Sequence, residues 1–331
     1  MKINNLSLDQ GVACYYSSFI NVAKFHNENM MGEDYLFLSE EGMALQTNID
    51  DIHSLKDVVI SNNLNKLIKT FLEKYSIKNE YNQFSEFPLF LEYIFNEVHK
   101  SNPIIIMTNS DLLSHDQSYN YNKRRTHILV VHGFDVKMGI LHFIDYFIPT
   151  FPAKIYNGCM SINALKSTAL INDNLYYAFY FDIPKLKKNN FSYSTTDYIH
   201  DLKKCVDIYM SELSKMRGIS FLVNNAMERF GENDIKNHLQ EVVYNIMYNS
   251  IIPCRTILKN ICNNNDWLDS RDKFDKIISE WYSISLALIK CGIVPKDIKF
   301  EKISEKINTL IDREKEVMSV LRGKDVMHDS N

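Results

Sequence analysis

The sequence predicts an α+β chain in which helices come first, an antiparallel sheet follows and an all-helical region ends the chain. Between residues 104 and 182, short β-branched and aromatic runs stand between polar turns, a pattern typical of strands. Beyond residue 190 the apolar residues recur only at helical spacing. We therefore expect two domains, 1–187 and 190–331, with the polar segment Pro184–Asn190 at their boundary.

Helices are expected in the first hundred residues. An apolar run at helical spacing follows Cys14 directly, and Pro88 fits the first turn of a helix over 88–98. Two further helices are expected at about 35–45, capped near Ser39, and at about 54–75.

The expected sheet begins with Ile104–Met107, a short apolar run typical of a buried strand. A polar loop over 108–126 follows it. Two further strands, one opened by His127 and one over Gly139–Tyr146, are joined as a hairpin. A helix over 161–170 and a β-prone strand, Leu175–Asp182, complete this half of the chain.

The second half is predicted to be helical over about 196–217, 233–263 with an interruption at Pro253, 271–291 and 298–321. One helix carries an apolar stripe that predicts either an internal core or the interface of a homodimer. Its residues are Ile277, Ile278, Trp281, Ile284 and Leu288.

Composition excludes several classes of protein. The net charge of −4 offers no basic footprint for nucleic acid, and no apolar run is long enough to span a membrane. The first residues lack the apolar core of a signal peptide. The six cysteines are spread singly, which argues against a zinc ribbon and against a disulfide framework. We therefore expect a cytoplasmic protein with reduced thiols.

Cys14 is the candidate nucleophile. The polar, glycine-containing stretch Asp9–Ala13 precedes it, which places the thiol in the first turn of the expected helix. Unpaired backbone N–H groups and the helix dipole stabilise a thiolate there. A thiol also needs a base to hold its proton, and a lone free cysteine is more often a small core residue.

The candidate base is His127, and the carboxylate that would orient it is Asp145 at the end of the next strand. His132 and His142 compete with His127, and each histidine has the alternative of being a hydrogen-bonded sheet residue. Asp135 is the second choice of carboxylate, although its place in the sequence is typical of a hairpin turn.

Gln10 is the candidate oxyanion donor. It precedes Cys14 closely enough for its amide to act together with the Cys14 backbone N–H, and the alternative is a solvated turn glutamine.

Five short motifs stand in order along the chain: Gly11–Cys14, Leu38–Glu41, Pro103–Ile106 with Asp111, His127–Asp135 and Phe143–Asp145. Together they resemble the N-terminal domain family of the butirosin-biosynthesis acyltransferase, over about residues 8–182. That family looks like a papain-type cysteine-protease fold, close to bacteriocin-leader peptidases, reused for acyl transfer. The region 190–331 is similar to the helical extension that many members carry.

The resemblance implies a cysteine-dependent acyltransferase of specialised metabolism that needs no cofactor or metal. Cys14 would accept the acyl group from a carrier-protein phosphopantetheine thioester, His127 would act as base and acid, Asp145 would orient it, and a small amine would receive the acyl group. In papain-type enzymes the oxyanion glutamine usually stands six residues before the cysteine, a position that Leu8 occupies here.

Three basic residues stand directly before His127. Lys123, Arg124 and Arg125 are candidates for gripping an acidic carrier protein or its phosphopantetheine phosphate, and the alternative is a solvated basic loop.

Three other functions remain open at this point. The same triad would serve a peptidase or thioesterase that uses water in place of an amine, and the fold could also be kept by a non-catalytic binding protein. A metal site at Cys14, His26 and His127 ranks last, because these residues lack a recognisable ligand spacing.

Overall fold

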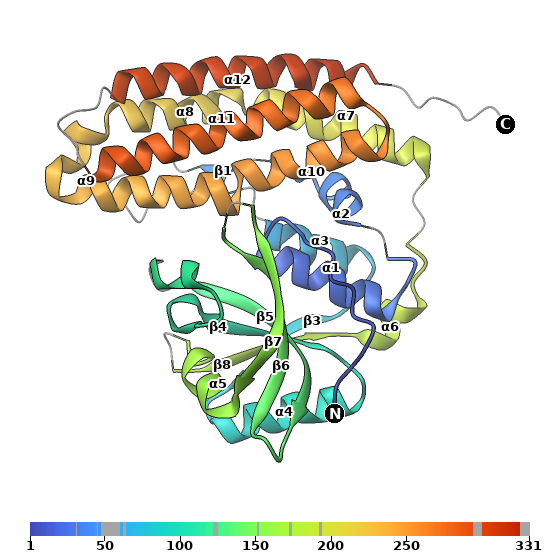
Figure 1. The fold of residues 1–331 in the computed structure, drawn as a ribbon. Coiled ribbons are helices and arrows are strands. Elements are labelled where there is room, and N and C mark those ends of the chain that lie inside the picture. Colours follow the sequence, from blue (N-terminus) through green and yellow to red (C-terminus); the bar gives the residue numbers. More distant parts are fainter. Residues whose placement is uncertain are drawn as a thin grey trace. The chain divides into compact units, whose positions relative to one another are not determined.

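The computed structural model describes residues 1–30, 32–44, 46–47, 60–61, 64–121, 125–150, 152–171, 174–191, 194–293 and 300–324. The chain divides into two compact units, Met1–Glu33 with Ile68–Ser192 and Asp34–Leu67 with Tyr193–Asn331. N-terminal helices, an antiparallel sheet and a helical C-terminal region confirm the predicted α+β class (Figure 1). The grouping of Asp34–Leu67 with the C-terminal helices was not predicted.

The first unit is built on a six-stranded sheet in which each neighbouring pair is antiparallel. In spatial order the strands are β3 (Asn79–Phe84), β8 (Tyr176–Phe181), β4 (Ile104–Asn109), β5 (Thr126–Asp135), β6 (Ile140–Ile148) and β7 (Lys154–Ser161). The predicted hairpin is formed by β5 and β6, and β4 is the predicted buried strand.

Helices α1 (Cys14–His26) and α4 (Phe87–His99) pack against this sheet. Leu129 and Val131 of β5 are buried in one apolar core together with residues of α4. The alternate residues Ile128 and Val130 are also buried, and strand alternation turns them toward the other face, where α1 packs on β5 and β6. The two helices therefore cover opposite faces of the central strands (Figure 1).

Two strands and one helix of this unit were not predicted. Strands β3 and β7 lie at the two edges of the sheet. The polar segment around Pro184, which we expected to form the domain boundary, contains α6 (Ile183–Lys188). Asp182 caps this helix by accepting from the Lys185 backbone N–H, and Pro184 stands in its first turn, where no helical hydrogen bond is lost. Helix α5 (Ile162–Thr168) was predicted correctly.

Two predicted N-terminal helices differ in extent. Helix α2 (Glu33–Ser39) ends before the predicted 45, and Ser39, which we expected to cap the helix, is its last residue. Glu41 then adopts a left-handed backbone with φ 60°, which helical residues do not have. The Gly42 N–H then bonds to the Phe37 carbonyl at 2.8 Å, a closure typical of helix C-termini. The helix expected over 54–75 is α3 (Leu64–Lys74), preceded by the short strand β2 (Ile60–Ser61). Residues 54–59 and 62–63 of that prediction lie outside the described residues.

The C-terminal region consists of helices wherever the structure describes it: α7 (Thr195–Ser211), α8 (Leu213–Asn224), α9 (Ala226–Tyr244), α10 (Ile251–Asn264), α11 (Leu268–Ile293) and α12 (Phe300–Arg322). The helix interruption expected at Pro253 lies earlier, at the short π-helix η4 (Asn245–Asn249). Pro253 itself stands in the first turn of α10. A short two-stranded sheet of β1 (Gln46–Thr47) and β2 belongs to the same unit.

The apolar stripe of α11 is part of the core of the helical unit. Ile277, Trp281, Ile284 and Leu288 are all buried within the chain itself. The structure therefore supports the internal-core alternative for this stripe. A homodimer stays a prediction.

A buried ion pair lies among these helices. Glu314 of α12 and Arg255 of α10 are 1% and 2% exposed, and two guanidinium nitrogens donate to the Glu314 oxygens at 3.1 and 2.7 Å. The Tyr209 hydroxyl and the Trp281 indole N–H donate to the same carboxylate at 2.6 and 2.5 Å. Four donors thus satisfy one carboxylate inside the helical unit.

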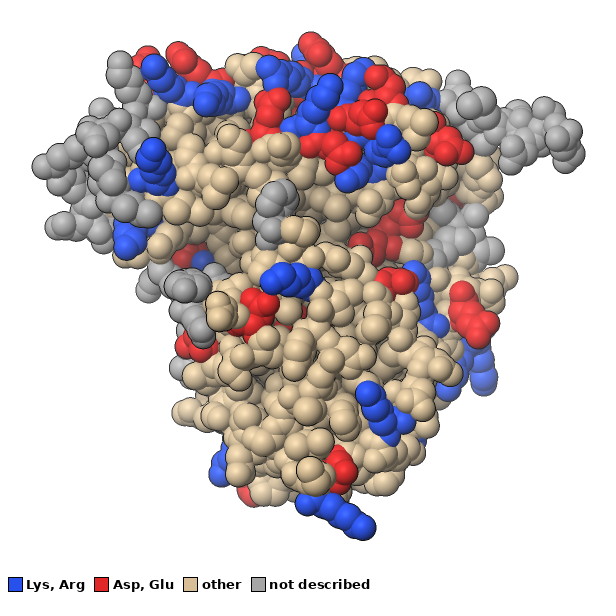
Figure 2. Space-filling model, in the orientation of Figure 1, with Lys and Arg blue, Asp and Glu red and all other residues tan. Residues whose placement is uncertain are grey.

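The exposed charges of the helical unit are mixed in sign. Lysines and arginines stand among aspartates and glutamates along its outer helices (Figure 2). Arg313 pairs with Glu280, and Arg217 pairs with Asp312 at 2.7 Å. Among the residues that the structure describes, no helix is long and apolar enough to cross a membrane.

Candidate active site

Cys14 stands at the first position of α1, as predicted. The residue before it, Ala13, has an extended backbone and no side-chain oxygen to cap the helix. The thiol is free and partly exposed. Four of the other cysteines (Cys205, Cys254, Cys262 and Cys291) are buried, and Cys159 is exposed. Cys14 therefore combines a helix N-terminus with access for a reactant.

Gly11 allows the chain to approach the start of α1 closely. A Cβ atom at this position would lie 1.9 Å from the Ser17 hydroxyl and 2.1 Å from a carboxylate oxygen of Glu33. Ser17 in turn donates to Glu33 at 3.2 Å and accepts from the Ala13 N–H at 3.3 Å. Gly11 therefore lets the chain pack closely against Ser17 and Glu33 at the start of α1.

Three hydrogen bonds hold the segment that leads to Cys14. The Tyr146 hydroxyl donates to the Ser7 carbonyl at 2.8 Å, and the Asn21 amide donates to the Asp9 carbonyl at 3.1 Å. The Gln10 amide donates to the Ala153 carbonyl at 2.6 Å. Gln10 is exposed and bonded to backbone in this structure, and its role as an oxyanion donor stays a prediction.

His127 and Asp145 are brought together by the hairpin of β5 and β6. The register pairs Val130 with Ile144 and Val131 with Phe143, so the two residues lie near one another at the same end of the hairpin. Nε2 of His127 is 3.0 Å from Oδ1 of Asp145. Both side chains are buried, at 6% and 0% exposure. The structure therefore forms the predicted imidazole–carboxylate pair.

The competing residues lie in other surroundings. His132 contacts the Ile3 carbonyl through Nδ1 at 3.2 Å, and its ring lies 6.3 Å from that of His142. Asp135 accepts from the Met138 N–H at 3.0 Å, as expected for a hairpin turn. Of the histidines considered from sequence, His127 is the one bonded to Asp145. Asp145 lies within β6 and not at its end as predicted, because the strand continues to Ile148.

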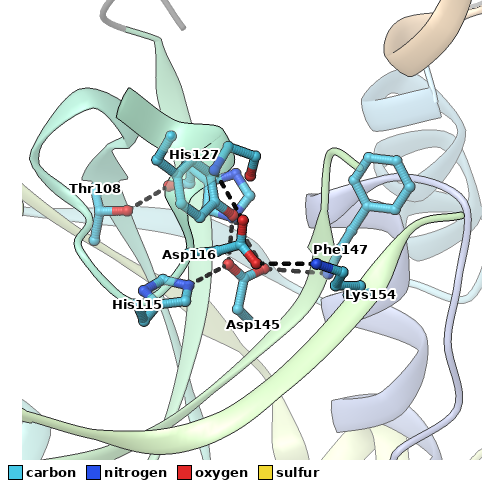
Figure 3. Close-up of polar contacts among 9 residues, drawn as sticks. Thr108, His115, Asp116, His127, Asp145, Phe147 and Lys154 are labelled. Carbon is cyan, nitrogen blue, oxygen red and sulfur yellow. Dashed lines mark hydrogen bonds and ion pairs between the residues drawn. The ribbon is translucent and has the colours of Figure 1, made fainter. Parts of the chain in front are cut away.

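Two residues that the sequence did not single out also bond to Asp145. The Tyr119 hydroxyl donates to Oδ2 at 2.5 Å, and Nε2 of His115 lies 2.9 Å from the same oxygen. The Phe147 backbone N–H donates to Oδ1 at 3.1 Å. Figure 3 shows His115, His127 and Phe147 around the Asp145 carboxylate, with their bonds to it drawn as dashed lines.

The 108–126 loop supplies both additional residues. His115 precedes the short 3₁₀ helix η3 (Gln117–Tyr121), and Tyr119 lies within it. A polar connection of this length inside a compact domain is a signal for a functional loop, and that signal could have drawn attention to its histidine and tyrosines. Nothing in the spacing indicates that they reach Asp145, which is 30 and 26 positions later.

The electrostatics of the site favour a charged pair. Burial would lower the pKa of His127, but the Asp145 charge and hydrogen bond outweigh it, with a further contribution from the Cys14 side chain, and the pKa rises to about 10. Burial would raise the pKa of Asp145, but the His127 charge and the bonds from His115, His127 and Tyr119 lower it well below its usual range. Burial and the Asp145 charge raise the pKa of Tyr119 far above its ordinary value.

The His127 ring can serve both of its neighbours. Nε2 faces Asp145, and the Cys14 side chain is the other hydrogen-bonding partner that raises the pKa of His127. Because Nε2 is engaged, Nδ1 is the nitrogen available to Cys14. An imidazolium beside a cysteine at a helix start stabilises the thiolate form. The arrangement can therefore support nucleophilic attack by sulfur followed by proton transfer through one histidine.

The basic residues before His127 are only partly described. Lys123 and Arg124 lie outside the described residues. Arg125 is partly buried, and its backbone pairs with Ser110, whose N–H donates to the Arg125 carbonyl at 2.8 Å. Docking of a carrier protein at these residues stays a prediction.

The metal alternative does not fit the geometry. Cys14 and His26 are the first and last residues of α1, and twelve residue steps at about 1.5 Å each separate them by roughly 18 Å. They cannot share one ion with His127. Within the described part of the chain, no group of three or more His, Cys, Asp or Glu side chains is arranged to hold a metal.

Comparison of the chain with models of known protein families and with curated proteins finds no match.

Proposed function

We propose that this protein is a cysteine-dependent acyltransferase that forms an amide by moving an acyl group from a carrier-protein thioester, through Cys14, to an amine. The observation that carries the proposal is a partly exposed Cys14 at the start of α1 that interacts with His127, which is bonded to the buried Asp145. A nucleophile, a base and an orienting group in this order are what covalent acyl transfer requires.

In the first step, the Cys14 thiolate attacks the thioester carbonyl of the donor. The bond between the carbonyl carbon and the pantetheine sulfur breaks, and the departing thiolate takes the proton of the His127 imidazolium. The acyl group is now a thioester of Cys14. Exchange of one thioester for another is close to thermoneutral, so no other energy source is needed.

In the second step, a neutral amine attacks the Cys14 thioester. The carbon–sulfur bond breaks, an amide bond forms, and the amine proton passes to His127, which restores the thiolate and imidazolium. The amide is more stable than the thioester, so this step runs downhill. Water competes with the amine, and its exclusion from Cys14 decides whether the enzyme is a transferase or a hydrolase.

The choice of amine over water is supported by the sequence resemblance to the butirosin-type acyltransferase family. The same resemblance supports a papain-like fold for residues 1–187, and the observed order of nucleophile helix followed by antiparallel sheet is compatible with it. The carrier protein, its phosphopantetheine arm and the basic residues 123–125 as a docking site belong to this proposal.

The experiment is intact-mass measurement after mixing the protein with a small acyl-pantetheine thioester. We expect one added acyl mass on the wild type and none on Cys14→Ala. A matched variant, Cys159→Ala, removes the other exposed thiol and should acylate as the wild type does. Adding a diamine should remove the acyl mass from the protein and give an amide product.

Two outcomes would contradict the proposal. Discharge of the acyl-enzyme only to the free acid, with several amines tried, would indicate a thioesterase or peptidase. No adduct with either the small donor or a carrier-borne acyl group would leave a non-catalytic binding protein as the better interpretation.

A further inference from the structure

The two oxygens of Asp145 have different partners. Oδ1 accepts hydrogen bonds from Nε2 of His127 at 3.0 Å and from the Phe147 backbone N–H at 3.1 Å. Oδ2 accepts hydrogen bonds from the Tyr119 hydroxyl at 2.5 Å and from Nε2 of His115 at 2.9 Å. A carboxylate offers about four lone-pair directions, so these four donors fill it. The carboxylate is therefore held in one orientation, in which Oδ1 faces His127, the candidate base.

The hydrogen bonds also fix where the protons lie. The Tyr119 proton points to Oδ2, so the Tyr119 oxygen can only accept from Nε2 of His127, 2.9 Å away. Nε2 then faces two acceptors, this oxygen and Oδ1, and must carry a proton. When the ring is neutral, Nδ1 is therefore the unprotonated nitrogen, the one left to take a proton from Cys14.

The two donors to Oδ2 are themselves held in place. His115 is stacked on Tyr156 with ring centroids 4.8 Å apart, and it meets Phe143 edge to face at 5.1 Å. Tyr119 is 1% exposed and meets His115 edge to face at 5.2 Å. Neither ring can turn away from Asp145 without breaking this packing.

We propose that Tyr119 and His115 are positioning residues of the candidate active site. By occupying Oδ2 of Asp145, they direct Oδ1 to His127 and keep the His127 proton on Nε2, so that Nδ1 serves Cys14. This inference rests on the proposed thiol chemistry. It assigns a purpose to the chain between β4 and β5, whose described residues 110–121 supply both donors to Oδ2.

The charged groups around this network come from four elements. Cys14 faces His127 from α1, and Asp145 lies on β6. Asp116, beside η3, exerts its charge on Tyr119 and pairs with Lys154 of β7 at 3.5 Å (Figure 3). None of these groups is changed by the substitutions below.

The test is the pH dependence of Cys14 alkylation by iodoacetamide, followed by peptide mass mapping between pH 5 and 10. This readout needs no acyl donor. The variants are Tyr119→Phe, which removes one hydroxyl, and His115→Phe, which keeps an aromatic ring but no donor. The matched control is Tyr176→Phe, because Tyr176 lies in the same unit and its hydroxyl donates to the Lys166 carbonyl at 3.4 Å, not to Asp145. Thermal unfolding of each variant is measured alongside.

In the wild type, we expect Cys14 to be alkylated faster than the exposed Cys159, which serves as the internal reference thiol. In Tyr119→Phe and in His115→Phe, the pH of half-maximal reaction should rise, and the rate near pH 6.5 should fall about tenfold. The rate at pH 10 should stay close to that of the wild type. The melting temperature should fall modestly, because each variant loses one donor to a buried carboxylate. Tyr176→Phe should react as the wild type does.

Unchanged profiles in both variants would overturn the positioning role. A shift to lower pH would also overturn it, because it would mean that the two donors only attenuate the charge of Asp145. A uniform loss at all pH values with a lower melting temperature would indicate a purely structural role and would also overturn it. If wild-type Cys14 reacts no more readily than Cys159 at any pH, the proposed function and this inference fall together.

Discussion

Each unit of the molecule buries one carboxylate that accepts from four donors, and the two sites differ in what those donors can do. Glu314 in the helical unit is held by a guanidinium, an indole and a phenol. Asp145 in the sheet unit is held by two imidazoles, a phenol and a backbone N–H, and one imidazole interacts with Cys14. Burial and a full set of hydrogen bonds are common to both.

The difference between the two donor sets shows which features of a buried carboxylate indicate a catalytic role. A guanidinium keeps its proton over the whole accessible pH range, so the pair of Arg255 and Glu314 can only hold helices together. An imidazole can give up its proton, and here it lies next to a partly exposed thiol. A perturbed carboxylate by itself identifies neither role; the titratable donor and the adjacent nucleophile do.

The strongest test of this comparison is Asp145→Asn. The side-chain amide would present a donor where an acceptor is needed, which favours the wrong tautomer of His127. Acyl transfer through Cys14 should fall by about 10³-fold or more, as in other triads that lose their carboxylate. The rate is measured by single-turnover acylation and discharge. A loss below tenfold in folded protein would mean that Asp145 is no more functional than Glu314.

Glu314→Gln is the matching change in the helical unit. It leaves the buried Arg255 charge uncompensated and should cost about 3–5 kcal/mol of unfolding free energy. Both tryptophans of the chain, Trp267 and Trp281, belong to this unit, so their fluorescence in urea reports its unfolding. The acyl-transfer rate of protein that remains folded should not change. A lowered rate at unchanged stability would contradict the division of roles.

The pH dependence of stability also separates the two pairs. The pKa of His127 is raised from 6.5 to about 10 in the folded protein, so its contribution to stability is complete below pH 6.5 and is lost as the pH rises toward 10. The loss is at most about 1.4 kcal/mol per pH unit, because one proton is released. The contribution of Arg255 and Glu314 should stay constant over this interval.

The measurement is the difference in unfolding free energy between wild type and His127→Gln, taken at intervals from pH 6 to 10. The same difference between wild type and Glu314→Gln is the control. A His127 difference that is flat with pH would mean that the imidazole is not charged in the folded protein.

The parts of the fold that the sequence predicted are those with strong local patterns. The run Ile104–Met107 and the His127 strand are apolar and β-branched, and they became the central strands β4 and β5. The missed strands β3 and β7 lie at the sheet edges and contain many polar or small residues, so their single neighbour, and not their own composition, determines their conformation.

The site divides in the same way. Cys14, His127 and Asp145 lie on elements whose order can be read from the chain. The structure places Cys14 and His127 at the starts of α1 and β5, whereas Asp145 lies within β6, which continues to Ile148. His115 and Tyr119 come from a polar loop whose path depends on the packing of the His115 ring against Tyr156 and Phe143. Contacts between residues so far apart in the chain produce no recognisable spacing pattern in the sequence.

The bonds from Tyr146, Asn21 and Gln10 to the segment before Cys14 have a consequence for the entropy of catalysis. They tie residues 7–10 to β6, to α1 and to the chain just before β7. A chain held at three points has few conformations left to lose when a donor binds. Binding energy from the acyl donor is then available for the reacting atoms and is not consumed in ordering the backbone that carries the sulfur.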